Sequence, residues 1–311
     1  MEHEADSPAG DFIGHALHKR LQALTEEIAA IRAGQDRESV HRLRVASRRL
    51  RQALTVFAPS LPHKRLAGWQ KHLRQLTRAL GEAREADVQL DWLEPVLASE
   101  PEIHARPGIA RLHLRVLQHR QRLDFDLTAA LDAWESSETT AEISHVRRHH
   151  GVRPLPDAAR AVTERVDAMR ALASCLDDVE QVDELHAMRI AAKRLRYTAE
   201  LFAPLCDDQL EPALQDLRAL QALLGDVHDC DVWLAWLPRF STKELARTQR
   251  YFGHARPFGR LRPGLAYVAA QWQLHRDAQF RALTVFWQRS ESRNVWGNLL
   301  EILDDLPKPI H

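Results

Sequence analysis

Two segments of this sequence carry the same run of cationic side chains. The pattern H-x-x-R-x-x-x-[KR]-R-x-R begins at His41 and returns at His186, 145 positions further on. Arginine can bind phosphate or carboxylate through two parallel hydrogen bonds, and it keeps its charge at any physiological pH. The repeated pattern therefore predicts that the chain binds an anionic group at two matching places.

Helical geometry gathers these side chains on one face. At about 100° per residue, the repeated cations fall within roughly 80° of one another, and apolar side chains occupy the opposite face. Each copy is therefore predicted to be an amphipathic helix with a cationic stripe. The stripes consist of His41, Arg44, Arg48 and Arg51 in the first copy and of His186, Arg189, Lys193 and Arg196 in the second.

Acidic residues are missing from both stripes. A solvated helix usually alternates Glu with Lys or Arg at i, i+4, because such pairs stabilise it. Here no carboxylate lies between Arg42 and Arg51, and the second copy has none until Glu200. Because like charges on one stripe repel each other, the pattern favours an anion site over an ordinary solvated face.

The composition restricts the class of protein. The 311 residues carry 43 Lys plus Arg and 43 Asp plus Glu, so any basic site is local and a general polycation is excluded. Three cysteines, Cys175, Cys206 and Cys230, are typical of small buried side chains in a reducing compartment. No stretch approaches the ~20 apolar residues of a membrane span, and no signal peptide begins the chain. We therefore expect a soluble, cytoplasmic protein that does not enter a membrane.

Nearly every segment has a hydrophobic period of 3.6 residues, which predicts an all-α protein. We expect residues 1–10 to be disordered, residues 11–135 and 157–304 to form two helical halves, 136–156 to link them, and 305–311 to be a tail. The helices expected in the first half cover 11–32, 36–57, 63–80, 87–97 and 108–134, with Gly81 as a helix C-cap.

Two further motifs support an internal duplication. Residues 80–88 read L-G-E-A-R-E-A-D-V and match L-G-D-V-H-D-C-D-V at 224–232, while R-P-G-I-A at 106–110 matches R-P-G-L-A at 262–266. We therefore predict two tandem four-helix-type bundles related by a pseudo-two-fold axis. Such symmetry would bring both cationic stripes toward one shared groove.

With these motifs the sequence resembles the conserved histidine α-helical domain family, called CHAD, over about residues 11–304. The resemblance implies paired four-helix bundles whose basic helices line a pocket or pore that binds inorganic polyphosphate, at polyphosphate granules, with no cofactor and no firmly attached enzymatic activity. It would make the phosphate-contacting set His41, Arg44, Arg48, Arg49, Arg51, His186, Arg189, Lys193, Arg194 and Arg196. Many relatives carry an adjoining triphosphatase domain, but this chain lacks its Glu-x-Glu-x-Lys signature, so that chemistry is not expected.

Other arginines are second-rank candidates for the groove. Some occupy matching positions in the two halves, and others share one face of the helix expected at 108–134. They are Arg20, Arg165, Arg74, Arg218, Arg111, Arg115 and Arg122. Tyr267 and Gln271 stand where Arg111 and Arg115 would repeat, which predicts a groove that is more basic on one side.

The histidines and acids of the motifs have structural alternatives. His41 and His186 are expected to donate hydrogen bonds to phosphate, since neighbouring guanidinium groups oppose a bound metal ion. The acidic residues after each motif glycine are expected to cap helices or to orient arginines; they are Glu82, Glu85, Asp87, Asp226, Asp229 and Asp231. His145, His149 and His150 fall in the predicted linker. No metal site is expected.

Three functions fit these observations. The leading hypothesis is a non-enzymatic binder of inorganic polyphosphate. A nucleic-acid-binding helical protein is the second, although the stripes lack the exposed aromatic side chains that stack on single-stranded bases. The third is a phosphotransfer bundle with His41 as phosphoacceptor, but several arginines around each histidine are more typical of a clamp. The sequence leaves the oligomeric state open.

Overall fold

The computed structural model describes residues 8–34, 36–99, 103–146 and 158–304, which form helices and turns without a β-strand. The all-α prediction is therefore confirmed. The helices are α1 Pro8–Ala33, α2 Arg37–Val56, α3 His63–Ala98, α4 Arg106–Glu135, α5 Thr139–Ser144, α6 Ala158–Arg170, α7 Val182–Phe202, α8 Glu211–Phe252, α9 Arg262–Ser292 and α10 Val295–Asp304.

Three predicted boundaries are wrong. Helix α3 continues through Gly81, since a glycine inside a helix costs only about 1 kcal/mol and buried Leu80 and Ala83 hold both sides of it. Residues 8–10 begin α1 instead of belonging to a disordered end, and α5 occupies part of the predicted linker. Of the segments predicted to be disordered or linking, residues 1–7, 147–156 and 305–311, with His149 and His150, lie outside the described residues.

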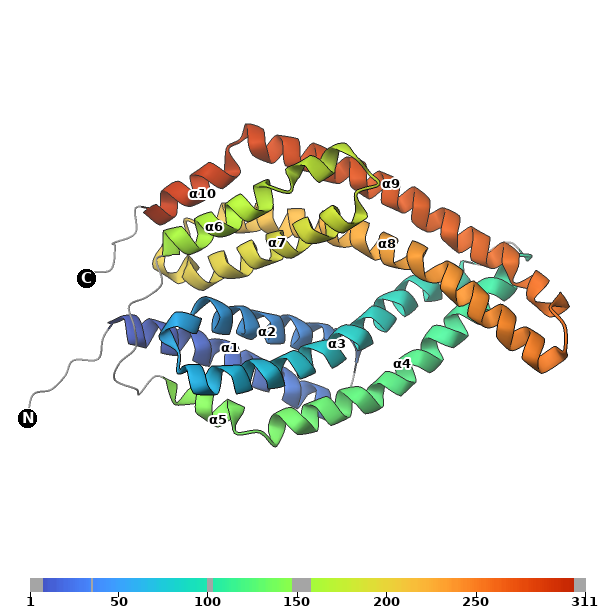
Figure 1. Ribbon diagram of the computed structural model, residues 1–311, viewed down its shortest axis with the longest axis horizontal. Coiled ribbons are helices and arrows are strands. Elements are labelled where there is room, and N and C mark those ends of the chain that lie inside the picture. The colour runs from blue at the N-terminus through green and yellow to red at the C-terminus, as the bar shows by residue number, and fades with distance from the viewer. Residues whose placement is uncertain (1–7, 35, 100–102, 147–157, 305–311) are drawn as a thin grey trace, which may run out of the picture.

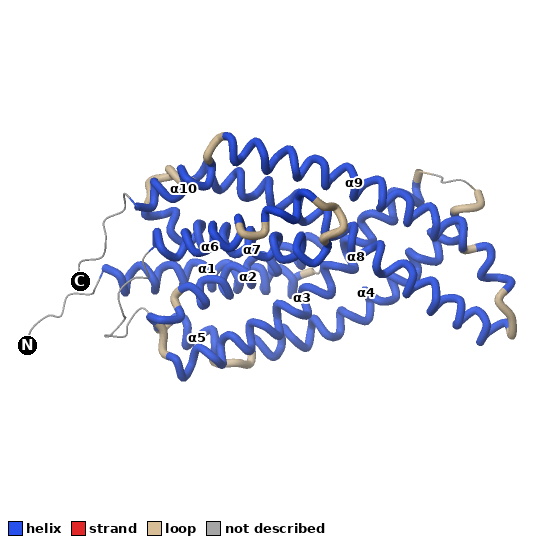
Figure 2. Tube along the Cα trace, turned by 45° about the horizontal axis from the view of Figure 1, so that its top comes forward, coloured by secondary structure: helices blue, strands red, loops and turns tan. Residues whose placement is uncertain are grey.

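The helices form two groups that face each other (Figure 1). Helices α1 to α5 lie on one side and α6 to α10 on the other, and the described ends near both termini lie at the same end of the molecule. The long pairs α3–α4 and α8–α9 extend away from that end and cross, where α4 contacts α9 (Figure 2). Helices α2 and α7, which carry the cationic stripes, also contact each other across the two groups.

Apolar side chains from both groups join at each end of the molecule. At one end Phe57 of the first group meets Phe202 of the second, with ring centroids 6.4 Å apart and the planes at 89°. At the other end Trp92 contacts Trp272 at 5.0 Å and Trp233 at 5.7 Å. These contacts belong to two separate buried clusters. Burial of apolar surface therefore holds the groups together on both sides of the region between them.

The boundary between the two clusters falls within α3 and α8. Along α3 the first cluster ends at Ala83 and the second begins at Ala86; along α8 they meet between Val227 and Cys230. Polar residues of the repeated L-G motifs lie at this boundary. The three cysteines are buried and form no disulfide, as expected. None of the described helices is both long and apolar enough to cross a membrane.

Candidate functional site

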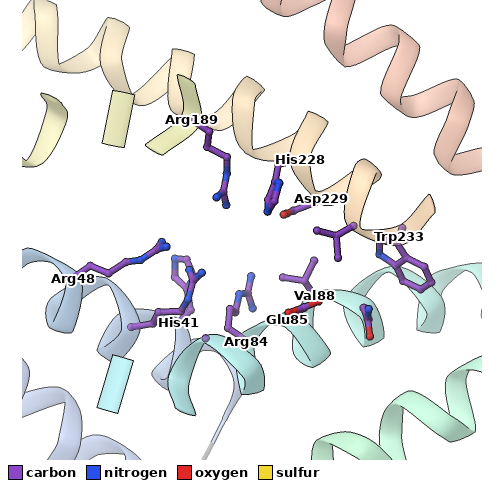
Figure 3. A pocket seen from close by; sticks show the side chains of 13 residues that line it. His41, Arg48, Arg84, Glu85, Val88, Arg189, His228, Asp229 and Trp233 are labelled. Atoms are coloured by element: carbon purple, nitrogen blue, oxygen red, sulfur yellow. The ribbon is translucent and has the colours of Figure 1, made fainter. Parts of the chain in front are cut away.

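A cavity of about 390 Å³ lies between the two groups of helices at the boundary of the apolar clusters. Figure 3 shows side chains of α2 and α3 pointing into it from one side and those of α7 and α8 from the other. Its lining consists of His41, Arg44, Arg48, Gly81, Arg84, Glu85, Val88, Gln89, Arg189, His228, Asp229, Val232 and Trp233. Each cationic stripe therefore contributes to one shared cavity.

Three arginines of the stripes line this cavity without a carboxylate partner. Within the described part of the chain, no acidic oxygen lies within 4.0 Å of Arg44, Arg48 or Arg189. Burial lowers the pKa of all three, and the charges of Arg48 and Arg189 help to lower the pKa of Arg44 to about 10. The cavity therefore holds several cationic groups whose mutual repulsion an anionic ligand would relieve.

Lys193 lies beside these arginines and is only 8 % exposed. Burial lowers the pKa of its amine to about 6, with further lowering by the charges of Arg189, Arg48 and Arg44. No carboxylate oxygen of the described residues lies within ion-pair distance of it. At neutral pH much of this lysine is therefore uncharged in the unliganded protein.

His228, which lines the cavity, is paired with His186, which does not. The Nδ1 atoms of His186 and His228 are 3.1 Å apart, so one ring must accept the hydrogen bond through an unprotonated nitrogen. Burial is the largest cause that lowers the pKa of His228 to about 3, followed by the charge of Arg189. On the opposite wall, buried Nδ1 of His41 has no hydrogen-bond partner. Protonation of the two imidazoles in the lining, His41 and His228, would add positive charge beside a bound anion.

Two carboxylates also reach the cavity, from matching positions of the repeated motifs. Burial is the largest cause of the raised pKa of Glu85 and of Asp229, and each has another carboxylate nearby. The surroundings thus disfavour the charged forms of these acids. The lining also holds six cationic or imidazole side chains from α2, α3, α7 and α8, several of which are labelled in Figure 3: His41, Arg44, Arg48, Arg84, Arg189 and His228.

Other acids of the motifs orient buried arginines, as expected. Asp87 accepts a hydrogen bond from Arg120 at 2.7 Å, and at the matching position Asp231 accepts one from Arg276 at 2.5 Å. The alternative prediction, that these acids cap helices, is wrong because they lie inside α3 and α8. Among the described residues, no group of three or more His, Cys, Asp or Glu side chains is placed to hold a metal ion.

Six residues of the predicted phosphate-contacting set do not line the cavity: His186 and Lys193, described above, and Arg49, Arg51, Arg194 and Arg196. Arg49 and Arg196 both approach Glu200, at 3.1 and 3.5 Å, so their charges are compensated within the chain. Arg51 and Arg194 are exposed, and the charge of each acts on the other through space. Along α2 the cationic stripe thus continues from the cavity onto the surface.

The second-rank arginines are divided among several environments. Arg74 lies near Arg51 on the surface, Arg218 pairs with Glu211 at 2.8 Å, and Arg20 donates to the Glu200 carbonyl oxygen at 3.4 Å. Arg165 is half-buried on α6 and does not line the cavity. None of these four arginines belongs to the lining.

The remaining second-rank arginines are on α4. Arg111 and Arg115 both donate to the buried carboxylate of Glu244, at 2.5 and 3.1 Å. Arg122 is exposed and donates to the carbonyl oxygen of Gln118. This group lies away from the central cavity and lines or borders a second one, described below.

Most of the residues that the predicted site lacked belong to the L-G motifs, and the other two, Gln89 and Trp233, directly follow them. Arg84 and His228, Glu85 and Asp229, and Val88 and Val232 are matching pairs, and all six line the cavity. The repeat itself was the available signal. We expected each motif glycine to end a helix. That expectation put the residues after the glycine at the start of a new helix, whereas they lie inside the continuous helices α3 and α8 that line the cavity.

The fold and the cavity define an all-α protein in which two groups of helices enclose a cationic site. The CHAD domain family matches residues 15–238, more than half of the sequence, and this chain belongs to that family. It is 31 % identical over 238 residues to an uncharacterized protein of Mycobacterium tuberculosis strain CDC 1551 / Oshkosh, and equally to one of strain H37Rv. These matches cover 71 % of this chain but only 44 % of each relative, so the chain spans less than half of their length.

Solved structures share the fold. PptA from Streptomyces chartreusis superposes with a TM-score of 0.70 at 17 % identity, covering 91 % of this chain and all of PptA. The CHAD domain from the plant Ricinus communis superposes with a TM-score of 0.60 at 22 % identity, covering all of this chain and 96 % of that domain. At these identities the likeness concerns the fold alone.

Proposed function

We propose that this chain binds inorganic polyphosphate in the central cavity and does not turn it over. The observation that carries the proposal is that Arg44, Arg48 and Arg189 converge on one cavity without carboxylate partners among the described residues. Such arginines can grip successive phosphates through bidentate, charge-assisted hydrogen bonds. A linear polyanion would also continue along the exposed cations Arg51 and Arg194.

The matching positions support a duplicated origin for the two halves. Arg44 and Arg189 line the cavity from opposite sides at a sequence shift of 145, and three pairs from the L-G motifs do so at a shift of 144. We propose that the halves arose by internal duplication and are related by a pseudo-two-fold axis through this cavity. A polyphosphate chain suits such a site, because its two directions are chemically alike.

Binding of polyphosphate of defined chain length, measured by calorimetry across ionic strength, tests the proposal. Arg44→Glu and Arg189→Glu should each weaken binding at least tenfold and make its dependence on salt concentration shallower, because fewer counterions are displaced. The control is Arg281→Glu, an exposed position on α9 that does not line the cavity. Unchanged affinity in both cavity variants would exclude this cavity as the site.

Two further measurements separate the competing functions. Orthophosphate release during prolonged incubation would indicate a hydrolase, whereas retention of intact polyphosphate supports a binding role. Competition by RNA and DNA at physiological salt should be weak, because the central cavity offers Trp233 as its one aromatic ring beyond its histidines. We propose that the binding serves to place the protein at polyphosphate granules in the cytoplasm, which imaging of the tagged chain would test.

A further inference from the structure

A second cavity of about 520 Å³ lies between α3, α4 and α8. It adjoins the central one, because Glu85 and Gln89 line both. Its cations come from two helices: Arg115 and Arg122 from α4, and Arg239, Lys243 and Arg247 from α8. Polyphosphate binding in the central cavity, as proposed above, gives this second cavity no role.

The cations of this cavity fall into two kinds. Arg115 and Arg247 both donate to Glu244, which is fully buried, at 3.1 and 3.2 Å, so this carboxylate holds them in place. In contrast, Arg122, Arg239 and Lys243 have no carboxylate within 4.0 Å in the part of the chain that the structure describes. Three positively charged side chains without an ion-pair partner therefore surround the arginines that Glu244 holds in place.

The fold itself does not require these charges, as the other half shows. The pseudo-symmetric positions on α9 and α3 are all uncharged. Gln271, Ala278, Pro95 and Ser99 stand where Arg115, Arg122, Arg239 and Lys243 would repeat. Gln271, Ala278 and Pro95 lie inside α9 and α3, whereas Ser99 follows the last residue of α3. Helices therefore form at three of the four positions without these charges, so helix formation there does not require the cationic cluster. This difference also accounts for the lopsided distribution of charge expected from Tyr267 and Gln271.

The remaining walls of the second cavity combine aromatic rings with hydrogen-bond acceptors. Trp236 and Phe240 form an aromatic wall, with ring centroids 5.1 Å apart. On the α3 side, Glu82, Glu85 and Gln89 present hydrogen-bond acceptors. The carboxylates can accept hydrogen bonds from hydroxyl and amino groups, which a chain of phosphates alone does not carry.

We propose that this second cavity binds a nucleoside polyphosphate. Its phosphates would contact Arg122, Arg239 and Lys243, its base would lie against Trp236, and its ribose hydroxyls or amino group would donate to the acceptors on α3. Stacking on aromatic rings and charge-assisted contacts to phosphate are the interactions that recognise the two parts of such a ligand. Cations, aromatic rings and acceptors within one cavity fit this ligand better than a polymer of phosphate alone.

ATP and tripolyphosphate, each without divalent cations, are the probes, and calorimetry gives their dissociation constants. The main variant is Arg122→Ala/Lys243→Ser, because it places at two exposed positions the residues found at matching positions of the other half. We expect it to weaken ATP binding at least tenfold and tripolyphosphate binding less than threefold. Arg281→Ala/Lys71→Ser, at exposed positions outside both cavities, removes the same charge and should change neither constant.

Two further variants separate this proposal from the central site. Trp236→Leu should weaken ATP and leave tripolyphosphate binding unchanged, whereas Arg44→Glu/Arg189→Glu should weaken long polyphosphate and retain ATP. ATP affinity within twofold of wild type in Arg122→Ala/Lys243→Ser overturns the proposal. The proposal is also overturned if ATP binding is lost only in Arg44→Glu/Arg189→Glu. An equal loss of ATP and tripolyphosphate binding in Arg122→Ala/Lys243→Ser would overturn it as well. A thermal unfolding curve for each variant confirms that it is folded.

Discussion

Gly108 and Gly264, the matching glycines of the two R-P-G motifs, touch each other where α4 crosses α9. A Cβ atom added to Gly108 would lie 2.8 Å from the Gly264 Cα and 2.2 Å from the carbonyl oxygen of Leu261. Added to Gly264, it would lie 2.1 Å from the carbonyl oxygen of Ala105. Only glycine at both positions lets the two helix starts meet, and this contact helps to fix how the two groups of helices are placed around the central cavity.

Gly108→Ala should therefore destabilise the protein by roughly 1–3 kcal/mol, because the neighbouring atoms are backbone and cannot rotate away. Urea denaturation measures the change in the free energy of unfolding. Gly68→Ala is the control, since a Cβ there meets no atom within 4 Å and alanine favours a helix by about 0.5–1 kcal/mol. Equal effects of the two substitutions would show that the crossing does not depend on the glycine contact.

Arg48 and Arg49 are neighbours in sequence that should differ in function. Arg48 lines the central cavity, while Arg49 is exposed and paired with Glu200 at 3.1 Å. We expect Arg48→Ala to weaken polyphosphate binding about tenfold, which corresponds to a loss of about 1.4 kcal/mol of binding free energy. Arg49→Ala should weaken it less than threefold. Calorimetry at one salt concentration measures both. A larger effect of Arg49→Ala would place the polymer on the outer surface of α2.

Lys193→Met should stabilise the unliganded protein while weakening polyphosphate binding. The folded-state pKa of Lys193, about 6, lies below its ordinary 10.5, so folding opposes the charged amine. Below pH 6 the amine is charged in both states, and the full free-energy cost of burying the charge lowers the stability of the folded protein. This cost disappears as the pH rises toward 10.5, because the unfolded chain then also loses the proton. Replacing a buried charge with an apolar side chain of similar volume is expected to raise the free energy of unfolding by about 1–4 kcal/mol.

Thermal or urea unfolding from pH 6 to 10 tests this dependence for Lys193→Met. The stabilisation should be largest near pH 6 and fade at high pH. Lys64→Met, at an exposed position of α3, is the matched substitution and should show no such dependence. A variant that is less stable than wild type at pH 6 would contradict the burial of an unfavourable charge.

Polyphosphate binding should be accompanied by proton uptake. The pKa values of Lys193 and His228, about 6 and about 3, are lowered by burial and by neighbouring cations, and those of His41 and His186 are lowered for the same causes. A bound polyanion favours the charged forms and raises these values. Affinity should therefore increase as the pH falls from 8 to 6.

Calorimetry in two buffers of different ionisation enthalpy measures the number of protons taken up at pH 7.5. Lys193→Met should lower that number, because Lys193 contributes most of the change near neutral pH. Identical binding enthalpies in the two buffers would contradict proton uptake. Such a result would leave the arginine contacts as the whole basis of binding.

The sequence alone determined the helical class and the existence of a cationic site. Period-3.6 patterning is a local property, and so are the charges of a helix face, which is why α2 and α7 could be predicted with their apolar sides inward. The repeat also indicated that His41 and His186 belong to matching helices. Acids that orient buried arginines, such as Asp87 with Arg120, were among the predicted alternatives.

Tertiary structure decided which cations share a space. Arg48 and Arg49 have the same residue type and similar neighbours in sequence, yet only the packing of α2 against α7 brings Glu200 to one and leaves the other in the cavity. The sequence could not reveal that α3 continues through Gly81, because local signals for a helix end were overruled by burial on both sides. The second cavity likewise depends on α4 and α8, which are distant in sequence and meet only in the folded chain.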